Sequence, residues 1–462
     1  MGAVPEIIYP QTDMGNAMRF AEKFGNKVRY DQTSGKWMAW DGRRWDRTGG
    51  ETQAQMYCRG VAIDLHQELG NCVDSDEKKK TFRHWQYTSS AAGVRNMLFL
   101  VRSEPGIAMT EDKLDAHPWL LNVMDGTIDL TTGEIKPHDP NDMITQLAPV
   151  YYRKDVEHPS IERWSKCLHT WHPNDDGMIE YLQKLMGYCL TGVITSRCLP
   201  IFWGTGKNGK NGFIDPFIEM LGDYAGVAAR TLVEGAGREE HCTEVADLWK
   251  KRLVLASEPK KGSKLKVSLV KAMTGDKEMK ARFMRQDFFE FMPTHKLIML
   301  TQNLPAVEET TDAIWDRIHK IQWGVRISRE EQNPNLNEDL KAEWTGILRW
   351  AIQGCLEWQK PPGILLPTKK IERDTSEYRN DQNPAKKFVD SMFVMGLGLF
   401  VSSAEVNRLL GSWISDGHDL LTKEELTAYL VDAGCIKNHL KKIGGMPIRG
   451  WLGVGIRNAG GE

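Results

Sequence analysis

The spacing of apolar residues changes along the chain and predicts several structural regions. Residues 1–155 combine short helical stretches with aromatic hairpins. The segment Trp37–Trp45 alternates around an Asp-Gly turn, and Val123–Gly133 gives a second hairpin signal. Tryptophans can stack on bases, but we interpret these as filling a small β core. The pattern therefore predicts an α+β N-terminal domain.

Two further patterns follow along the chain. Apolar residues recur at helical spacing between Ile161 and Leu190, so residues 156–195 are predicted to form a helical collar or linker. Residues 196–360 alternate strand-like runs with helical stretches, which is typical of an α/β domain. Its predicted strands are Leu199–Trp203, Arg252–Ser257 and Lys296–Thr301.

A boundary is predicted after the α/β domain, where three prolines precede a polar run. Beyond it, residues 384–462 are predicted to form a small module. Helices are expected near 384–396, 403–415 and 422–433, with Gly-rich short strands around 446–456. This order suits a winged helix. The whole chain is thus predicted to be a multidomain α/β protein.

Composition limits the class of protein. The 462 residues are 41% hydrophobic and 26% charged, which is ordinary for a globular protein and excludes a mainly disordered chain. No run approaches the ~20 apolar residues that span a bilayer, and the first residues lack a basic region followed by an apolar run. We therefore expect a cytoplasmic protein without a membrane partner. The eight cysteines form no CxxC pair, and we expect reduced, mostly buried thiols.

Charge is distributed unevenly. The formal net charge is only −2, so any nucleic-acid surface must be local. Between Lys250 and Lys296 there are 13 Lys or Arg residues against 5 Asp or Glu residues. This basic excess lies within the α/β domain.

A glycine-rich segment provides the strongest functional signal. It follows an apolar strand and precedes a predicted helix, and it consists of Gly204, Thr205, Gly206, Lys207, Asn208, Gly209, Lys210 and Asn211. Glycines allow backbone N–H groups to surround phosphates at a helix N-terminus, while Lys210 reaches the β and γ phosphates. A Gly-rich turn alone would be weak evidence. Strand, spacing and lysine together predict that ATP is bound here.

Two residues depart from the usual pattern of such loops. Asn211 stands where a Ser or Thr hydroxyl normally coordinates Mg²⁺, although its amide oxygen could also be a ligand. Pro216 removes one hydrogen bond early in the following helix. We therefore expect nucleotide binding with Mg²⁺ and leave the hydrolysis rate open.

Three residues are candidates for a catalytic role. Glu258 follows the second predicted strand, where an acid can hold Mg²⁺ and polarise water; otherwise it is a solvated strand end. Asn303 follows the third strand and could contact the γ-phosphate or the water, although Asn before Leu-Pro is also a common turn residue. Arg317 could serve the nucleotide of a neighbouring subunit, or it could be a surface residue.

Taken together, these residues resemble the phage and plasmid primase-helicase family, which includes the poxvirus primase-helicase and belongs to helicase superfamily three. The likeness covers nearly the whole chain. The segments that carry it include Asn122–Leu130, Pro137–Pro140, Leu185–Gly192, Leu221–Tyr224 and, most specifically, Thr274–Phe291. The resemblance implies an AAA+ P-loop ATPase core in residues 196–360.

The resemblance also implies roles for individual residues. Lys210 would contact phosphate, Glu258 would be the Walker B acid, Asn303 the sensor, and Arg317 an arginine finger acting across a subunit boundary. A segment before the sensor strand would grip DNA, and its candidate residues are Lys277, Lys280, Arg282 and Arg285. The active form would be a homo-oligomeric ring, expected to be a hexamer, that moves 3′→5′ on single-stranded DNA.

The sequence departs from relatives in three places. Only Arg317 is carried over where relatives often have two arginines, and Asn211-Gly212 replaces a common Ser-Thr pair. The first 155 residues lack the acidic metal-binding pattern expected of a primase, so no primase activity is predicted, and a separate primase or initiator is a candidate partner.

The predicted function is that of an ATP-dependent replicative DNA helicase of a phage, plasmid or other mobile element, acting on single-stranded and forked DNA. One alternative is an ATP-switched, DNA-binding initiator or loader with little unwinding activity. A second is an unrelated P-loop kinase or metabolic ATPase. That reading leaves the basic excess and Arg317 unexplained.

Overall fold

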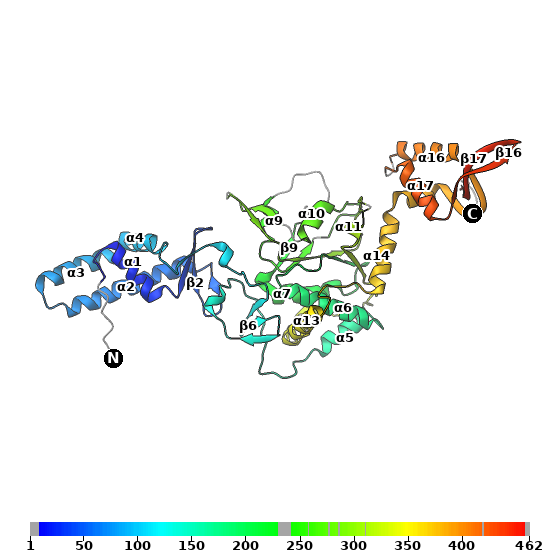
Figure 1. Ribbon diagram of the computed structural model, residues 1–462. Helices are drawn as coiled ribbons and strands as arrows, with labels where there is room; N and C mark the ends of the chain where they lie inside the picture. The colour runs from blue at the N-terminus through cyan, green and yellow to red at the C-terminus, as the bar shows by residue number, and fades with distance from the viewer. Residues whose placement is uncertain are drawn as a thin grey trace.

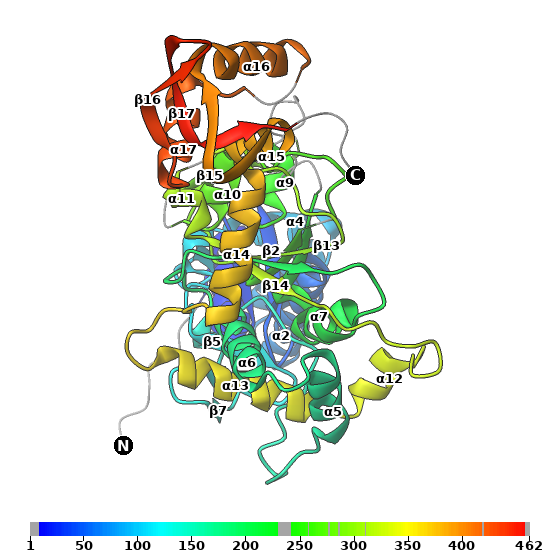
Figure 2. The same cartoon turned by 90° about the vertical axis from the view of Figure 1, so that its right-hand side faces the viewer.

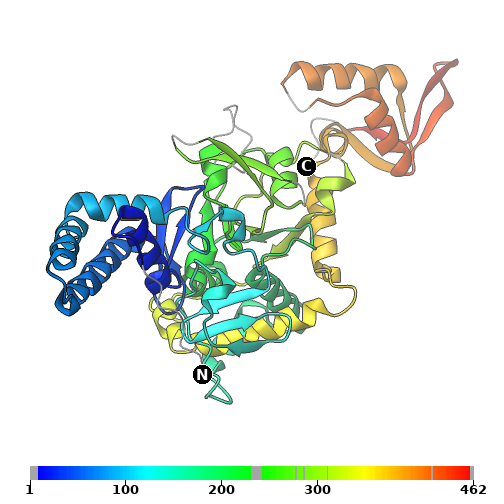
Figure 3. The same ribbon diagram turned by 60° about the vertical axis from the view of Figure 1, so that its left-hand side comes forward.

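The computed structural model describes residues 9–229, 242–256, 258–275, 278–284, 287–309, 311–417 and 420–457. They form an elongated molecule with an N-terminal body at one end, an α/β domain in the middle and a C-terminal module at the other end (Figure 1). Figure 3 shows the same separation from another side. Within the described residues, no helix has the length and apolar composition needed to cross a membrane.

The N-terminal body consists of four helices packed on a small sheet. Its helices are α1 (Asp13–Phe24), α2 (Gly50–Asn71), α3 (Ser75–Thr88) and α4 (Ala91–Val101). The sheet has the order β3-β2-β1-β4 and contains β1 (Val28–Asp31), β2 (Lys36–Trp40), β3 (Trp45–Asp46) and β4 (Ala108–Met109).

The first predicted hairpin is confirmed, because Trp40 of β2 pairs with Trp45 of β3 in antiparallel register. Trp37 and Trp45 are buried, as expected for tryptophans that fill a core. The helices differ from the prediction of short helical stretches, since α2 alone has 22 residues.

A second small sheet connects the N-terminal body to the centre. It contains β5 (Leu120–Val123), β6 (Gly126–Asp129) and β7 (Glu134–Lys136), and the short 3-10 helices η1 (Glu111–Lys113) and η2 (Pro140–Asp142) flank it. The second predicted hairpin is confirmed by the pairing of Val123 with Gly126. Leu121 and Ile128 belong to the same hydrophobic core as Leu182 and Ile352 of the central helices. A single core thus extends across the boundary predicted at residue 155.

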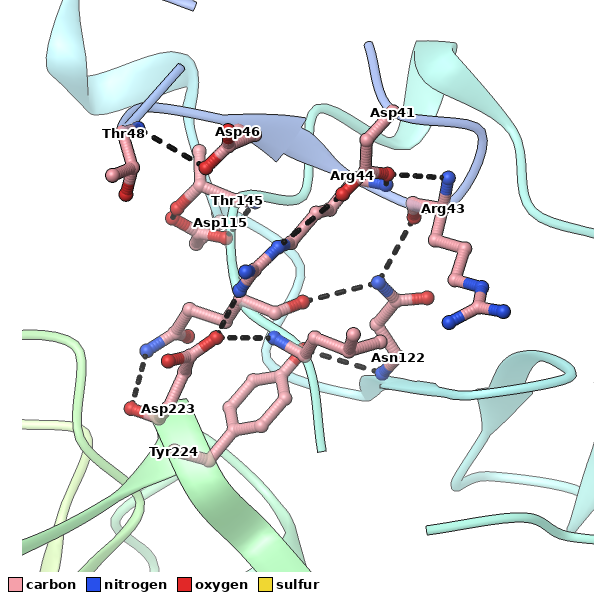
Figure 4. Close-up of polar contacts among 12 residues, drawn as sticks. Asp41, Arg43, Arg44, Asp46, Thr48, Asp115, Asn122, Thr145, Asp223 and Tyr224 are labelled. Atoms are coloured by element: carbon pink, nitrogen blue, oxygen red, sulfur yellow. Dashed lines mark hydrogen bonds and ion pairs between the residues drawn. The ribbon is translucent and has the colours of Figure 1, made fainter. Parts of the chain in front are cut away.

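A polar junction holds these parts together (Figure 4). The buried Asn122 side chain donates hydrogen bonds to the carbonyl oxygens of Arg43 and Gln146, both at 3.0 Å, and its backbone N–H donates to the Tyr224 hydroxyl at 3.2 Å. Arg44 forms an ion pair with Asp223. The N-terminal hairpin, the second sheet and the central domain therefore meet at one asparagine.

The central domain contains a five-stranded, wholly parallel sheet with the order β14-β8-β13-β10-β9. Its strands are β8 (Leu199–Trp203), β9 (Ala225–Ala228), β10 (Leu253–Ala256), β13 (Lys296–Thr301) and β14 (Ile318–Gln322). The predicted strands at 199–203 and 296–301 are confirmed. The predicted strand at 252–257 is one residue shorter at its start, and Ser257 lies outside the described residues.

Helices surround this sheet (Figure 2). They are α5 (Glu162–Trp171), α6 (Asp176–Leu190), α7 (Lys210–Leu221), η3 (Gly222–Tyr224), α9 (Cys242–Ala246), α10 (Val267–Met273), α11 (Asp312–Trp315), α12 (Leu336–Lys341), α13 (Trp344–Gln359) and α14 (Lys369–Gln382). An antiparallel hairpin, β11 (Met279–Arg282) and β12 (Phe288–Phe291), precedes β13.

The predicted helices between residues 161 and 190 are confirmed as α5 and α6. Helix α6 packs closely along α13, because glycines remove side-chain bulk at the contact. A Cβ on Gly187 would lie 2.1 Å from the backbone nitrogen of Cys355, and one on Gly354 would lie 2.1 Å from the Gln183 carbonyl oxygen. These helices share the core of the α/β domain, and their assignment as a collar stays a prediction.

Helix α14 leads from the central domain to the C-terminal module (Figure 2). The module consists of α15 (Pro384–Met392), β15 (Phe393–Ser402), α16 (Ser403–Ser415), α17 (Lys423–Asp432), β16 (Ile436–Ile443) and β17 (Met446–Ile456). The prediction of a helix at 384–396 is wrong at its C-terminal end, because residues 393–402 form a strand that pairs with β17. The alternating apolar residues and glycines after Met392 suit a strand better than a helix.

Candidate nucleotide-binding site

The glycine-rich segment connects buried strand β8 to helix α7. Gly206 and Gly209 have φ angles of +97° and +89°, which L side chains rarely adopt. A Cβ on Gly204 would lie 2.4 Å from the carbonyl oxygen of Trp323, and one on Gly209 would lie 2.1 Å from Nε1 of Trp171. Two of the glycines thus lack space for a side chain, and two have a conformation that favours glycine.

Helix α7 begins directly at this loop. Its N-cap, Gly209, has no side chain that could accept hydrogen bonds from the first turn, so backbone N–H groups there remain available to a ligand. The helix continues through the buried Pro216 to Leu221. A helix N-terminus of this kind attracts anions such as phosphate.

Lys210 is the first residue of α7 and is only 6% exposed. Its Nζ donates a hydrogen bond to the Gly204 carbonyl oxygen at 2.6 Å, which draws the side chain back over the loop. Burial lowers the pKa of Lys210, and the negative charge of Glu258 opposes that shift. Lys210 and Glu258, which are 48 positions apart in the sequence, therefore act on each other electrostatically.

Glu258 follows strand β10, which is separated from β8 by β13 in the sheet. Its Oε1 accepts a hydrogen bond from the backbone N–H of Gln302 at 2.9 Å. This contact is possible because β10 and β13 are adjacent and parallel, so the segments after them meet at one edge of the sheet. The predicted acid thus lies at the carboxyl ends of the strands, on the same side of the sheet as the predicted phosphate loop, Gly204–Asn211.

These elements enclose a cleft of about 480 Å³. Its described lining comes from the loop, from the first turns of α7 and from the carboxyl ends of β10 and β13: Gly206, Lys207, Asn208, Gly209, Lys210, Asn211, Gly212, Asp215, Leu255, Ala256, Glu258, Leu300, Thr301 and Gln302. A cleft at the carboxyl ends of parallel strands is the usual ligand site of an open α/β sheet. Most of the predicted loop residues therefore line one cavity.

Asn208 has a mainly structural role in the loop. Its side chain is 4% exposed, and Nδ2 donates a hydrogen bond to the Trp323 carbonyl oxygen at 3.1 Å. Asn211, in contrast, is exposed and lines the cleft. The position where the sequence departs from the common Ser or Thr is therefore accessible to a ligand.

Three polar cleft residues were not predicted as site residues from the sequence. Asp215 is half-buried one helical turn after Asn211, and Nδ2 of Asn337 donates to it at 3.3 Å. Burial raises the pKa of Asp215, and the Asn337 hydrogen bond opposes this shift. Thr301 and Gln302 reach the cleft from the end of β13. A carboxylate at the fourth position after Asn211 was the available signal, since such residues share a helix face.

Asn303 is not among the described residues that line the cleft. Its backbone N–H donates to Oγ1 of Thr301 at 3.0 Å, and that hydroxyl donates to the Asn303 carbonyl oxygen at 2.6 Å. The structure therefore shows Asn303 in a tight turn, which was the alternative reading of this residue. Its role as a sensor stays a prediction.

Arg317 lies at the amino ends of the strands, whereas the cleft lies at their carboxyl ends. It directly precedes β14, and its carbonyl oxygen accepts a hydrogen bond from the backbone N–H of Leu199, the first residue of β8. The phosphate loop begins after the last residue of β8. A five-residue strand spans roughly 15 Å, so Arg317 is remote from the cleft of its own chain.

The predicted DNA-binding residues lie around the β11–β12 hairpin. Lys280 and Arg282 are exposed on β11, and their cationic groups lie 5.1 and 4.8 Å from the ring centroid of Phe288 on β12. Phe288 is 49% exposed and was not predicted as part of this surface. Lys277 and Arg285 lie outside the described residues.

The basic excess between Lys250 and Lys296 is only partly a surface feature. The buried Arg252 guanidinium donates to the carbonyl oxygens of Leu190 and Leu120, both at 2.6 Å. Lys296 is buried as well, and burial lowers its pKa to about 7. Lys250 pairs with Glu111. These three side chains are engaged in contacts within the protein, so the cationic surface is smaller than the residue count predicted.

Comparisons with known proteins show what the chain is similar to. A family model described as D5 N terminal like matches residues 17–170, and a family of unknown function (DUF5906) matches residues 202–317. A protein of Acanthamoeba polyphaga mimivirus named "Putative helicase" is 26% identical over 301 residues, which are 61% of this chain and 31% of that protein. A protein of Frog virus 3 with the same name is 30% identical over 220 residues, which are 42% of this chain and 22% of that protein.

The chain thus spans less than a third of the length of either relative. Among solved structures, an apo structure of the NrS-1 C-terminal region is 11% identical with a TM-score of 0.41, and the match covers 65% of this chain and 77% of that one. The two matched family models and the viral relatives support a resemblance to a phage and viral primase-helicase family.

Proposed function

We propose that this chain is an ATP-dependent replicative DNA helicase of a phage, plasmid or other mobile element. The observation that carries the proposal is the cleft at the carboxyl edge of the parallel sheet, where Lys210 and Glu258 come together beside a glycine-rich loop. The viral relatives, which are named "Putative helicase", suggest the class of reaction. In this proposal, the central domain is an AAA+ ATPase of helicase superfamily three.

The cleft fits a nucleoside triphosphate. The glycines let the loop pack closely against Trp323 and Trp171, where a Cβ would collide, and the first turn of α7 has N–H groups without a side-chain cap beside the cleft. Lys210 would exchange its bond to the Gly204 carbonyl oxygen for one to phosphate. Because that exchange removes the lysine from its own loop, nucleotide binding changes the contacts of the loop as well as its charge.

The cleft also has oxygen donors suited to Mg²⁺, which prefers carboxylate, carbonyl and water oxygens. Asn211 and Asp215 lie on one side, and Glu258 lies on the other. Bound Mg²⁺ would neutralise charge that develops on the phosphates. We assign Asn211 to direct or water-mediated contact with the metal and Asp215 to support from one turn further along the helix.

The residues of the chain would then perform hydrolysis as follows. Lys210 and the loop N–H groups hold the phosphates in place, and Glu258 accepts a hydrogen bond from the attacking water and orients it. Gln302 fixes Glu258 through its backbone N–H. Thr301 and Gln302 lie beside Glu258 at the end of β13, so they are better placed than Asn303 to contact the γ-phosphate or the water.

Arg317 supports a proposal that the active form is a ring, with a hexamer as the expected size. The arginine is about one strand length from the cleft of its own chain, so it can reach only the nucleotide of a neighbouring subunit. In ring ATPases such an arginine stabilises transition-state charge. The exposure and position of Arg317 fit this role, because the residue is only half-buried and directly precedes β14, an outermost strand of the sheet.

We further propose that the β11–β12 hairpin holds single-stranded DNA as the ring moves 3′→5′. Lys280 and Arg282 would bind phosphates without reading sequence, and Phe288 offers an exposed ring on which a base can stack. Glu290 pairs with Lys280 across the strands and limits the positive charge, which favours weak, repeated contacts over tight binding.

The alternative is an ATP-switched initiator or loader that binds DNA and unwinds little. The exposed Asn211 favours it, because a metal site without the usual hydroxyl fits slow turnover. A strand-displacement assay on a tailed duplex separates the two functions. A loader would bind DNA and assemble, but it would displace no strand.

One experiment tests the main proposal directly. ATP hydrolysis would be measured with and without single-stranded DNA while oligomer mass is followed by light scattering. We expect DNA to stimulate hydrolysis in an assembled form, and Lys210→Ala to abolish it. Hydrolysis by a monomer that ignores DNA would contradict the proposal and would favour a metabolic P-loop ATPase.

A further inference from the structure

Charges are separated within the C-terminal module. Its element order, α15-β15-α16-α17-β16-β17, places two consecutive helices before an antiparallel hairpin. In a helix-turn-helix arrangement the second helix normally enters the major groove. Here that helix would be α17, whose exposed charged residues are Lys423, Glu424, Glu425 and Asp432. Three carboxylates against one amine make α17 a poor partner for a polyanion.

The β16–β17 hairpin has the opposite character. From Ala433 to Arg457 the sequence contains five Lys or Arg residues and no Asp or Glu. Lys437, Lys441, Lys442 and Arg449 are all exposed. The hairpin projects away from the rest of the molecule at the far end of the module (Figure 1, Figure 3). Its charge is therefore available to a large ligand.

Strand register places these cations on both faces of the hairpin. Leu440 pairs with Arg449, and Lys442 pairs with Pro447, so Lys442 and Arg449 share one face. Lys441 lies on the other face, where its Nζ is 5.6 Å from the ring centroid of Phe400. Neither Lys442 nor Arg449 pairs with a carboxylate among the described residues.

The tip of the hairpin is apolar. Ile443 and Met446 pair across the Gly444-Gly445 turn and are 48% and 72% exposed. Cationic sides with an apolar tip match a nucleic-acid groove, in which phosphates line both walls and the floor presents bases and sugars.

We propose that the C-terminal module binds duplex DNA through the β16–β17 hairpin and not through helix α17. Lys442 and Arg449 contact one phosphate strand, Lys441 contacts the other, and the Ile443–Met446 tip lies in the groove between them. Binding is independent of sequence, because the hairpin supplies phosphate contacts without the acidic helix. The inference rests on the proposed DNA helicase function and identifies where the duplex ahead of the ring is held.

The test uses the full chain and a blunt 20-base-pair duplex, with affinity measured by fluorescence anisotropy over a range of salt concentrations. Lys442→Ala with Arg449→Ala removes two hairpin charges. Lys423→Ala with Arg408→Ala removes two charges from the helices of the same module and is the matched control. Each phosphate contact adds about 0.9 to the slope of log K against log salt. We expect the hairpin variant to lose roughly 1 to 2 from that slope and the control to retain it.

Equal slopes in the two variants would overturn the proposal, as would a loss confined to the helix control. Weakened binding of anionic phospholipid vesicles, with duplex binding unchanged, would also overturn it and assign the hairpin to a membrane surface. ATPase stimulation by single-stranded DNA is measured on the same variants. It reports on the proposed helicase function, so failure of that function is distinguishable from failure of the hairpin assignment.

Discussion

Replacement of Gly209 by Ala tests how the phosphate loop obtains its shape. Gly209 has a φ of +89°, and a Cβ there would lie 2.1 Å from Nε1 of Trp171. Trp171 cannot move aside easily, because it is 2% exposed and its ring packs against those of Trp164 and Trp323. The substitution therefore introduces backbone strain and a steric collision at one point.

The expected size of the effect follows from these two contributions. A left-handed conformation costs a non-glycine residue about 1–2 kcal/mol, and overpacking a buried site costs about 1–3 kcal/mol. The sum of about 2–5 kcal/mol corresponds to a loss of ATP affinity of roughly 30-fold to several thousand-fold if the strain is relieved by distorting the loop.

Binding of a fluorescent ATP analogue and urea denaturation would be measured on the same preparations. Gly106→Ala is the matched control, because Gly106 has a φ of +82° and nothing within 4 Å of its Cβ position. We expect the control to lose a little stability and no ATP affinity. If Gly209→Ala binds ATP within threefold of the unchanged chain, the steric argument for the loop is wrong.

Three further predictions concern the metal, the neighbouring subunit and pH. Asn211→Ser should lower the Mg²⁺ concentration needed for half-maximal ATPase, because a compact hydroxyl suits the octahedral shell; coincident titrations would refute this. Arg317→Ala chains mixed with Lys210→Ala chains should recover part of the ATPase, and no recovery despite subunit exchange would make Arg317 structural. Burial lowers the pKa of His172 and His319 to about 4, so stability should fall as pH decreases from about 6.5 towards 4, as checked by urea titrations.

Local sequence signals predicted the elements whose own residues carry a clear pattern. Strands β8 and β13 have continuous apolar runs, as buried parallel strands require, and both hairpin segments contain an Asp-Gly pair at or beside the turn. The long helix α2 was less visible, because its buried residues, Ala54, Cys58, Val61 and Leu65, form a narrow stripe among many polar residues. The strand β15 was missed because it follows helix α15 directly, with no turn residues between them, and was taken as part of that helix.

The candidate site shows the same distinction. The loop and Lys210 are consecutive in sequence, and Glu258 could be placed because it follows a strand. Asp215 and Gln302 were missed, because their positions in the cleft depend on helix phase and on where β13 ends. Sequence alone also could not show that Arg252 and Lys296 are buried donors to carbonyl oxygens and not part of a cationic surface. Counting charges cannot distinguish the two.

The proposed role of Arg317 would link hydrolysis to assembly. Each chain contains the phosphate loop, Glu258 and the candidate metal donors at one edge of the sheet, and Arg317 at the opposite edge. A rigid five-stranded sheet holds these two groups apart, so no loop movement within one subunit brings them together. If hydrolysis needs both groups, a monomer binds ATP without consuming it, and turnover begins only when a second chain presents its Arg317. The dilution at which ATPase disappears should then coincide with the dilution at which the proposed oligomer dissociates.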